Sequence, residues 1–174
     1  MIETRPDWCV SRQRVWGVPL PIFISKKDEK VLVDDEVFNN IANIFEKEGS
    51  DCWFENNKQK FLGKKYNEND FYQTTDIVEV WFDSGSTHSF VLEQRDDLKW
   101  PASLYLEGSD QHRGWFHSSL LESCGTRGRA PFESILSHGF VVDGKGLKMS
   151  KSLGNVIAPE DILKKYGADI LRIW

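Results

Sequence analysis

The sequence predicts an α/β fold that carries a small α+β insertion. Between residues 76 and 174, short apolar segments of strand length alternate with longer segments whose apolar residues recur at helical spacing. Residues 25–75, in contrast, are rich in Lys, Asp, Glu and Asn, which is typical of a module inserted at a surface. With 174 residues, 40% of them hydrophobic, the chain can bury one core of domain size.

Turn and cap residues predict the elements of residues 1–75. The apolar run from Gly17 to Ile24 indicates a strand that follows a turn stiffened by proline. Asp34 or Asp35 can cap a helix that Gly49 ends. Its apolar positions are Val37, Ile41, Ile44 and Phe45, with Lys47 in the last turn. We expect a small core made of Phe38, Trp53, Phe54 and Phe61.

The last hundred residues are expected to alternate strands and helices. Strands are predicted at Asp76 to Phe82, Ser103 to Leu106 and Ile135 to Val142. A helix is predicted from Gln111 to Ser123, closed by Gly125, with a buried stripe of Trp115, Phe116, Leu120 and Leu121. Pro159 suits the first turn of a helix through Lys165 that Gly167 ends, and residues 168–174 begin a further element.

Charge and cysteine usage narrow the classes of protein that the chain can belong to. The net charge is −5, divided as +3 over residues 1–27, −9 over residues 28–99 and +1 over residues 100–174, so no broad basic face for a nucleic-acid backbone is visible. No segment has the length of a membrane span or the apolar core of a signal peptide. The three cysteines are widely spaced and odd in number, which favours a reducing, cytoplasmic setting.

The segment Lys148-Met-Ser-Lys-Ser152 carries the strongest functional signal. On composition alone, two lysines in a polar loop are a solvated charge run. A phosphate-binding P-loop beginning at Gly139 is excluded, because Gly146 stands where that motif needs Ser or Thr. The segment follows His138-Gly-Phe140 by the length of a hairpin and precedes Leu153-Gly-Asn155. In this context it resembles KMSKS, the second signature of the class I aminoacyl-tRNA synthetases.

Four further blocks resemble one branch of that class, the isoleucyl-tRNA synthetases, in the right order. They are Arg5-Pro-Asp-Trp-Cys-Val-Ser-Arg-Gln-Arg-Val-Trp-Gly17, Val80-Trp-Phe-Asp-Ser-Gly-Ser86, Glu107-Gly-Ser-Asp-Gln-His-Arg-Gly-Trp-Phe116 and His138-Gly-Phe140. The resemblance covers nearly the whole chain and is weakest at residues 25–75. The first signature of the class, HIGH, is absent, as are the bulk of an editing domain and an anticodon-binding region.

The resemblance therefore implies a fragment of the catalytic domain. We expect the C-terminal half of a Rossmann-like class I synthetase catalytic domain: residues 1–24 follow the editing insertion, residues 25–75 form the inserted α+β module, and residues 76–174 belong to the nucleotide-binding fold with the KMSKS loop. The fragment is expected to be inactive alone, because the HIGH half is missing. The full enzyme is expected to be a cytoplasmic monomer that joins isoleucine to tRNA(Ile) by way of an adenylate made from ATP with Mg²⁺.

The resemblance also assigns roles to residues of this sequence. Lys148 and Lys151 would neutralise the ATP phosphates. The adenylate would be bound by Glu107, Gly108, Asp110, Gln111, His138, Val141 and Lys151. Trp81 and Trp115 would form the walls of the isoleucine pocket. No metal site is expected, and zinc in particular is not expected because Cys52 is the only cysteine in residues 25–75.

Several alternatives remain open at this stage. Asp110 can be a plain helix cap, Val141 an inward strand residue, and either tryptophan ordinary core. Arg12, Arg14 and Trp16 can form ion pairs at a domain junction or contact a tRNA acceptor stem. The fragment can also belong to a valyl- or leucyl-type enzyme, or to a non-catalytic module that binds adenylates.

Overall fold

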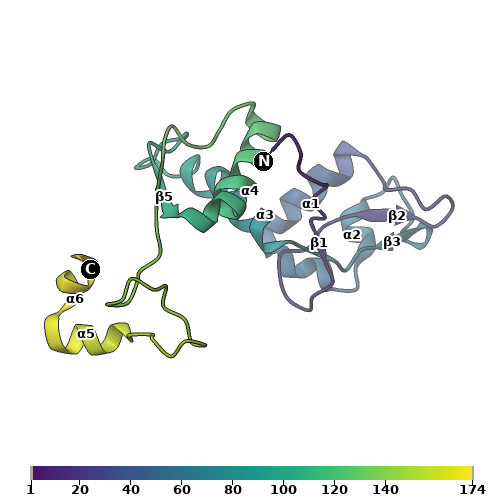
Figure 1. The fold of residues 1–174 in the computed structure, drawn as a ribbon. Coiled ribbons are helices and arrows are strands. Elements are labelled where there is room, and N and C mark those ends of the chain that lie inside the picture. Colours follow the sequence, from purple (N-terminus) through teal and green to yellow (C-terminus); the bar gives the residue numbers. More distant parts are fainter. Residues whose placement is uncertain (1, 174) are drawn as a thin grey trace. The chain divides into compact units, whose positions relative to one another are not determined.

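The structure is a computed structural model that describes residues 2–173. It divides into two compact units, Met1–Thr87 and His88–Trp174 (Figure 1). The predicted boundaries at residues 24 and 75 stay a prediction. In the part of each unit that the structure describes, the chain forms short strands in two-stranded sheets together with helices of up to 14 residues.

The first unit is organised around helix α1 (Asp35–Glu48). The Asp34 side chain caps it by accepting hydrogen bonds from the amides of Glu36 and Val37, and Gly49 ends it, as the sequence predicts. Its other described elements are β1 (Ser11–Arg12), β2 (Phe23–Ser25), η1 (Ser50–Phe54), α2 (Lys58–Leu62), η2 (Glu68–Asp70), β3 (Phe71–Gln73), β4 (Ile77–Val78) and α3 (Val80–Gly85). β2 pairs with β3 and β1 with β4, both antiparallel.

The core of this unit lies between α1 and the β2–β3 pair. It contains Phe23, Val37, Ile41, Ile44, Cys52, Trp53, Phe61, Leu62 and Phe71. Trp53 and Phe61 are fully buried as expected, but Phe38 and Phe54 are exposed, so the predicted core was half wrong. Phe38 lies on α1 and Phe54 on η1, and other residues of both elements are buried. The sequence alone does not show which face of an amphipathic element a single aromatic residue occupies, so both rings were wrongly assigned to the core.

Two predicted strands of this unit are much shorter in the structure. The run from Gly17 to Ile24 becomes a strand only at Phe23, because Pro19 and Pro21 carry no amide hydrogen for a ladder. The run from Asp76 to Phe82 is a strand only at β4, after which the Glu79 carboxylate accepts a hydrogen bond from the Trp81 amide at 3.0 Å. This cap starts helix α3, so Trp81 and Phe82 are helical.

The second unit contains the one parallel strand pair among the described residues. β5 (Tyr105–Gly108) and β6 (Ile135–His138) are parallel and are joined by α4 (Trp115–Arg127), which is the βαβ arrangement of α/β proteins. The α/β prediction is therefore confirmed at this unit. The remaining elements are η3 (His88–Leu92), η4 (Ser109–Arg113), α5 (Pro159–Tyr166) and α6 (Ala168–Ile173).

The bounds of three elements in this unit differ from the prediction. β5 begins two residues later than expected and includes Glu107 and Gly108. β6 ends at His138 rather than at Val142. Helix α4 begins at Trp115, runs through Gly125 and ends at Gly128, where the left-handed φ of 73° supplies the stop.

The buried face of α4 also differs from the expected apolar stripe. Phe116, Ser118, Ser119 and Ser123 are buried, whereas Trp115, Leu120 and Leu121 are half-buried. Helix α5 was predicted correctly: Pro159 is its first residue and Gly167 follows its last.

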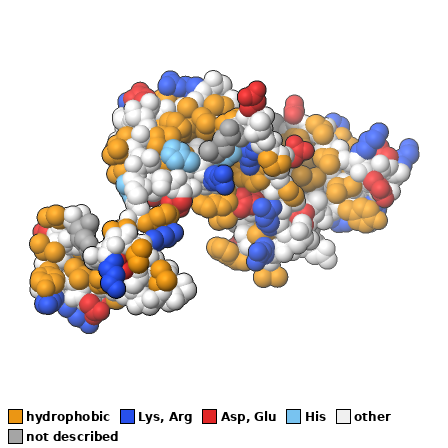
Figure 2. All heavy atoms as spheres, in the orientation of Figure 1, with side chains coloured by type: hydrophobic (Ala, Val, Ile, Leu, Met, Phe, Trp, Pro, Cys, Tyr) orange, Lys and Arg blue, Asp and Glu red, His pale blue; other side chains and the backbone are white. Residues whose placement is uncertain are grey.

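Large apolar side chains remain exposed in both units, and orange side chains are visible across the surface in Figure 2. On the parallel pair these include Leu106, 53% exposed, and Leu136, 55% exposed. Apolar surface of this kind on sheet residues is typical of a sheet that other parts of a protein cover.

Candidate functional site

The candidate site lies at the carboxyl ends of the parallel strands β5 and β6. In the register of this pair Glu107 is opposite Ser137 and Gly108 is opposite His138. Carboxyl ends of neighbouring parallel strands lie at the same edge of a sheet, and this edge is where α/β proteins bind ligands. Sequence reasoning placed Glu107, Gly108 and His138 in one site, and the register brings these three residues together.

Gly108 is the most closely packed residue of this edge. A Cβ atom at this position would lie 2.6 Å from Oδ1 of Asp110 and 4.0 Å from Cε1 of His138. Its backbone is in an ordinary extended conformation, with φ −63° and ψ 156°, so the absence of a side chain serves the close approach and not an unusual turn. The Asp110 carboxylate therefore lies directly over the end of β5.

Gln111 connects this edge to helix α4. Its Nε2 donates a hydrogen bond to Oδ2 of Asp110 at 3.1 Å, and its Oε1 accepts one from the amide of Trp115 at 3.0 Å. The amide oxygen of Gln111, and not a carboxylate, thus satisfies an amide at the start of α4. Asp110 accepts from Gln111 and does not cap α4, whose N-terminal capping residue is Gly114. This answers the alternative that Asp110 is a plain helix cap.

Trp115, a predicted wall of the isoleucine pocket, stacks face to face on Tyr105. Their ring centroids are 4.1 Å apart and their planes differ by 6°, a stacked pair. Tyr105 is 3% exposed and is the first residue of β5, two positions before Glu107. The same strand therefore supports the indole at its start and presents the carboxylate of Glu107 near its end.

His138 is exposed at the end of β6. Its Nδ1 lies 2.7 Å from the carbonyl oxygen of Gly139. A carbonyl oxygen only accepts, so Nδ1 carries the hydrogen, and in the neutral imidazole Nε2 is left as an acceptor. Val141 is 58% exposed and lies beyond the end of β6, so the alternative that it is an inward strand residue is wrong.

The predicted lysine loop follows a hairpin turn at residues 143–147. The amide of Asp143 donates to the carbonyl of Leu147, and Val142 pairs with Lys148 across the turn, as the Asp-Gly-Lys-Gly sequence predicts. Lys148 lies over the ring of Phe140, with Nζ 3.5 Å from its centroid. This contact brings Lys148 to the segment that directly follows His138, and Lys151 is exposed further along the loop.

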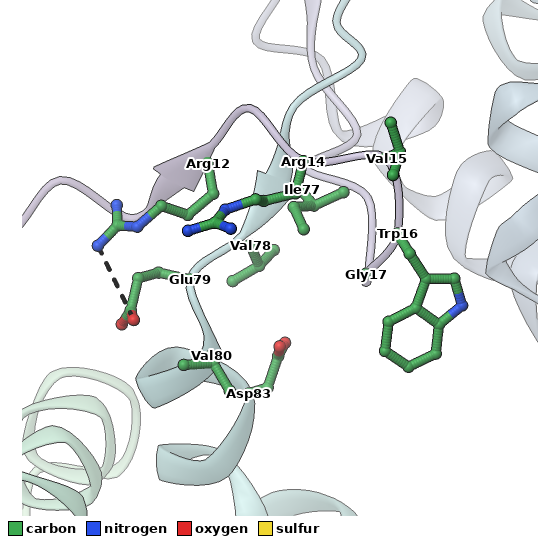
Figure 3. Close-up of a pocket in the computed structure, with 10 residues that line it drawn as sticks. All are labelled: Arg12, Arg14, Val15, Trp16, Gly17, Ile77, Val78, Glu79, Val80 and Asp83. Atoms are coloured by element: carbon green, nitrogen blue, oxygen red, sulfur yellow. Dashed lines mark ion pairs between the residues drawn. The ribbon is translucent and has the colours of Figure 1, made fainter.

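Trp81 lies in the first unit, on α3, and is 42% exposed. Nearby in that unit is a hollow of about 490 Å³ whose lining includes Arg12, Arg14, Glu79 and Asp83 (Figure 3). Arg12 reaches the buried Glu79 carboxylate at 3.8 Å. Burial and the neighbouring Glu79 raise the pKa of Asp83. Arg12 therefore has an ion-pairing role inside its own unit.

Trp16 and Arg14 also line that hollow, and both are exposed to solvent. The Trp16 side chain is 86% exposed.

Four residues to which the sequence analysis gave no role in the site take part in it. Tyr105 stacks on Trp115, Phe140 lies under Lys148, and Asp143 and Asn155 hydrogen-bond around the lysine loop. Of these four, only Asp143 could have been predicted from the sequence. Asp followed by Gly is typical of a turn in which the Asp side chain accepts hydrogen bonds from backbone amides that follow it. Tyr105 is indistinguishable in the sequence from any buried strand residue.

Among residues 2–173 the structure contains no group of three or more His, Cys, Asp or Glu side chains that is arranged to bind a metal ion. Cys52 is buried and its thiol donates to the carbonyl of Gly49. Within the same described range, every helix is too short or too polar to cross a lipid bilayer.

Comparison with known proteins connects this geometry to a family. A family model described as tRNA synthetases class I (I, L, M and V) matches residues 1–174. Two similar curated proteins are the isoleucine–tRNA ligases of Pelagibacter ubique (strain HTCC1062), 80% identical over 174 residues, and of Brucella abortus (strain 2308), 60% identical over 175 residues. Both matches include 100% of this chain but only 19% and 18% of the ligases.

A solved structure has a similar fold. It is the ternary complex of Agrobacterium radiobacter K84 agnB2 LeuRS-tRNA-LeuAMS, with a TM-score of 0.63 and 24% sequence identity. The similarity covers 95% of this chain and 23% of that chain, and it supports the Rossmann-like α/β class. The chain spans about a fifth of the length of the curated relatives that it matches.

Proposed function

Because the chain belongs to the family of class I tRNA synthetases for isoleucine, leucine, methionine and valine, we propose that it is the segment of an isoleucine–tRNA ligase that binds the adenylate and carries the KMSKS loop. The names of relatives at 80% and 60% identity over the whole chain support isoleucine rather than leucine or valine as the substrate. The solved leucine enzyme, at 24% identity, supports the fold only.

The proposed reaction begins with activation of the amino acid. The carboxylate of isoleucine attacks the α-phosphorus of ATP, the bond to the β-phosphate oxygen breaks, and pyrophosphate leaves. A carboxylate is already a nucleophile, so the step needs positioning and neutralisation of phosphate charge, not a general base. In the proposal, the positive charges of Lys148 and Lys151 neutralise the phosphates, and Mg²⁺ arrives with the nucleotide.

The strand edge is the proposed adenylate site. The exposed carboxylates of Glu107 and Asp110 accept hydrogen bonds from ribose hydroxyls, and Gly108 keeps the strand end open for the nucleotide. His138 and Val141 border the adenine, and Gln111 lies beside the acyl phosphate. Trp115 contacts the aliphatic side chain of isoleucine.

The observation that carries the proposal is the register of β5 and β6, which sets Gly108 opposite His138, with the Asp110 carboxylate close to Gly108. Two blocks of sequence thirty residues apart thereby contribute to one strand edge. The contact between Lys148 and Phe140 brings the start of the lysine loop close to the segment that follows His138.

The test uses a chimeric full-length ligase. In it, the 174 residues of this chain replace the matching segment of the Pelagibacter ubique enzyme, to which they are 80% identical. ATP–pyrophosphate exchange is measured with isoleucine, valine and leucine. We expect isoleucine to be preferred, and Lys151→Ala to lower kcat about 100-fold or more, as loss of one group that stabilises transition-state charge does.

Two results would contradict this proposal. Exchange that prefers leucine or valine would assign the chain to another branch of the family. Full exchange by the Lys151→Ala chimera would favour a module that binds adenylates without taking part in catalysis. The isolated 174-residue chain is proposed to be inactive, and the same assay measures this directly.

The remaining parts of the proposal follow from the same assignment. The partners are isoleucine, ATP and the acceptor end of tRNA(Ile), and the full enzyme acts as a monomer in the cytoplasm, a setting that the free cysteines fit. No zinc is proposed for residues 25–75, where Cys52 is the single thiol.

A further inference from the structure

Two side chains hold the lysine loop from inside. Oδ1 of Asp143 accepts hydrogen bonds from the amides of Lys145 at 2.8 Å and Leu147 at 2.9 Å, while Oδ2 accepts one from Nδ2 of Asn155 at 2.9 Å. Both oxygens of this carboxylate are therefore used within the chain. Asp143 fixes the hairpin turn and also attaches Asn155 to it.

Asn155 in turn reaches the backbone of the loop on both sides of Met149. Its Oδ1 accepts a hydrogen bond from the amide of Ser150 at 2.9 Å, and its Nδ2 lies 3.3 Å from the carbonyl of Lys148. The bond to Ser150 closes a loop of six residues that contains Lys151. One amide side chain thus satisfies backbone groups next to both lysines.

The lysine side chains themselves remain open to solvent. Lys148 and Lys151 are exposed, whereas Asp143, Ser150 and Asn155 are half-buried. The backbone groups of Lys148 and Ser150 are hydrogen-bonded to Asn155. Both lysine ammonium groups, in contrast, are accessible to an anion. Hydrogen bonds from Asn155, Leu147 and Lys145 lower the pKa of Asp143, so the carboxylate stays an acceptor well into the acid range.

We propose that Asp143 and Asn155 are positioning residues that set the backbone from which Lys148 and Lys151 reach the phosphates of ATP. This inference rests on the function proposed above. A loop that is held before the nucleotide arrives loses less conformational entropy in the transition state, so the bond between Asp143 and Asn155 should affect the rate of activation more than the binding of isoleucine.

The pair allows a test by exchange of its partners. In Asn155→Asp two carboxylates face each other at 143 and 155, and in Asp143→Asn two amide groups face each other. The double variant Asp143→Asn with Asn155→Asp restores a donor and an acceptor across the same gap, and the new carboxylate still accepts from the amide of Ser150. Asn39→Ala, on the exposed face of α1, is the matched control.

Each variant is made in the chimeric ligase, whose wild-type exchange and Lys151→Ala loss are measured first. We expect each single change to lower kcat of ATP–pyrophosphate exchange about 10- to 100-fold with KM for isoleucine unchanged. The double variant should recover at least about tenfold over Asn155→Asp, which is the sign of a direct pairwise contact. Asn39→Ala should keep the wild-type rate.

A role in positioning also predicts how the losses combine. If Asn155 acts through the two lysines, Asn155→Ala should lower kcat by less than about threefold in a chimera that already carries both Lys148→Ala and Lys151→Ala. Multiplicative losses, an equal fall for Asn39→Ala, or no recovery in the double variant would each overturn the proposal. If the wild-type chimera is inactive, or Lys151→Ala is fully active, the proposed function fails instead.

Discussion

Replacement of Gly108 by alanine should impair activation of isoleucine without harming the fold. The backbone at Gly108, with φ −63° and ψ 156°, suits any residue, so the substitution adds no backbone strain. The added carbon would lie 2.6 Å from Oδ1 of Asp110, and an ordinary van der Waals contact begins at 3.4 Å. The carboxylate must therefore move away by about 0.8 Å, which a side-chain rotation supplies at little cost to stability.

The functional cost follows from the size of that shift. A misplacement of about 1 Å in a group that positions the substrate can lower the rate about 100-fold. We therefore expect kcat/KM for ATP in the exchange assay to fall about 10- to 100-fold, which corresponds to about 1.4 to 2.7 kcal/mol of transition-state stabilisation. The melting temperature should stay unchanged, because no buried group loses a partner.

Gly125→Ala is the matched control. Gly125 lies within α4, and nothing is found within 4 Å of an added Cβ. Alanine there should leave exchange unchanged and stabilise the helix by roughly 0.5 to 1 kcal/mol. Wild-type kcat/KM in Gly108→Ala would refute the placement of Asp110 over the nucleotide, and so would an equal loss of activity in both variants.

Three further predictions follow. Trp53 is fully buried and donates from Nε1 to the carbonyl of Thr74 at 2.8 Å, so Trp53→Ala should lower the free energy of unfolding by about 3 to 5 kcal/mol in urea denaturation, with Trp53→Phe less affected; equal midpoints for both variants would contradict this. Hydrogen bonds from Lys65 and Tyr66 hold the pKa of Asp34 well below its usual range, so the carboxylate stabilises the first unit above its ordinary pKa of 3.8 and this contribution is lost as the pH falls toward the lowered value. Melting temperatures recorded between pH 2 and pH 5 should therefore depend less on pH in Asp34→Asn, and identical profiles would count against the assignment. Trp115→Ala should raise KM for isoleucine about tenfold or more and Trp115→Phe much less, because phenylalanine keeps a ring on Tyr105; an unchanged KM in the alanine variant would remove this residue from the pocket.

The ends of two helices could be predicted from residues close to them in the sequence. Helices α1 and α5 were predicted to within a residue or two, because Asp34, Gly49, Pro159 and Gly167 each act on backbone groups a few positions away. The strand boundaries were less accurate. A strand needs a partner, and the partners of β4 and β6 come from distant parts of the chain.

Gly125 and Gly128 illustrate the limit of local reasoning at α4. Both are small residues near the end of one apolar pattern, and only the left-handed conformation at Gly128 marks which one ends the helix. The error over Asp76 to Phe82 has a tertiary cause, because the buried Glu79 both caps α3 and pairs with Arg12 from a different strand.

The site was predicted in a different way. The resemblance of whole blocks supplied Glu107, Asp110, His138 and Lys151, and no rule of spacing alone would have united them. The parallel register then gave a physical reason for Glu107 and His138 to share an edge, and the close approach of Asp110 to Gly108 adds the third residue. The role of Asn155 was not predicted, because it depends on a hydrogen bond from its side chain to the amide of Ser150, five residues earlier. A single contact of this kind produces no periodic pattern in the sequence.

The connected series of Tyr105, Trp115, Gln111 and Asp110 bears on attempts to change which amino acid such a ligase accepts. Stacking links the first two rings, and single hydrogen bonds link the indole-bearing residue to the amide and the amide to the carboxylate. Because the link to Gln111 starts from the main-chain amide of Trp115, a designer who trims the indole to admit a bulkier side chain loses the stacking on Tyr105 but keeps the bonds to Gln111 and Asp110. Libraries that vary Trp115 together with Tyr105, and leave Gln111 and Asp110 unchanged, are therefore the better starting point.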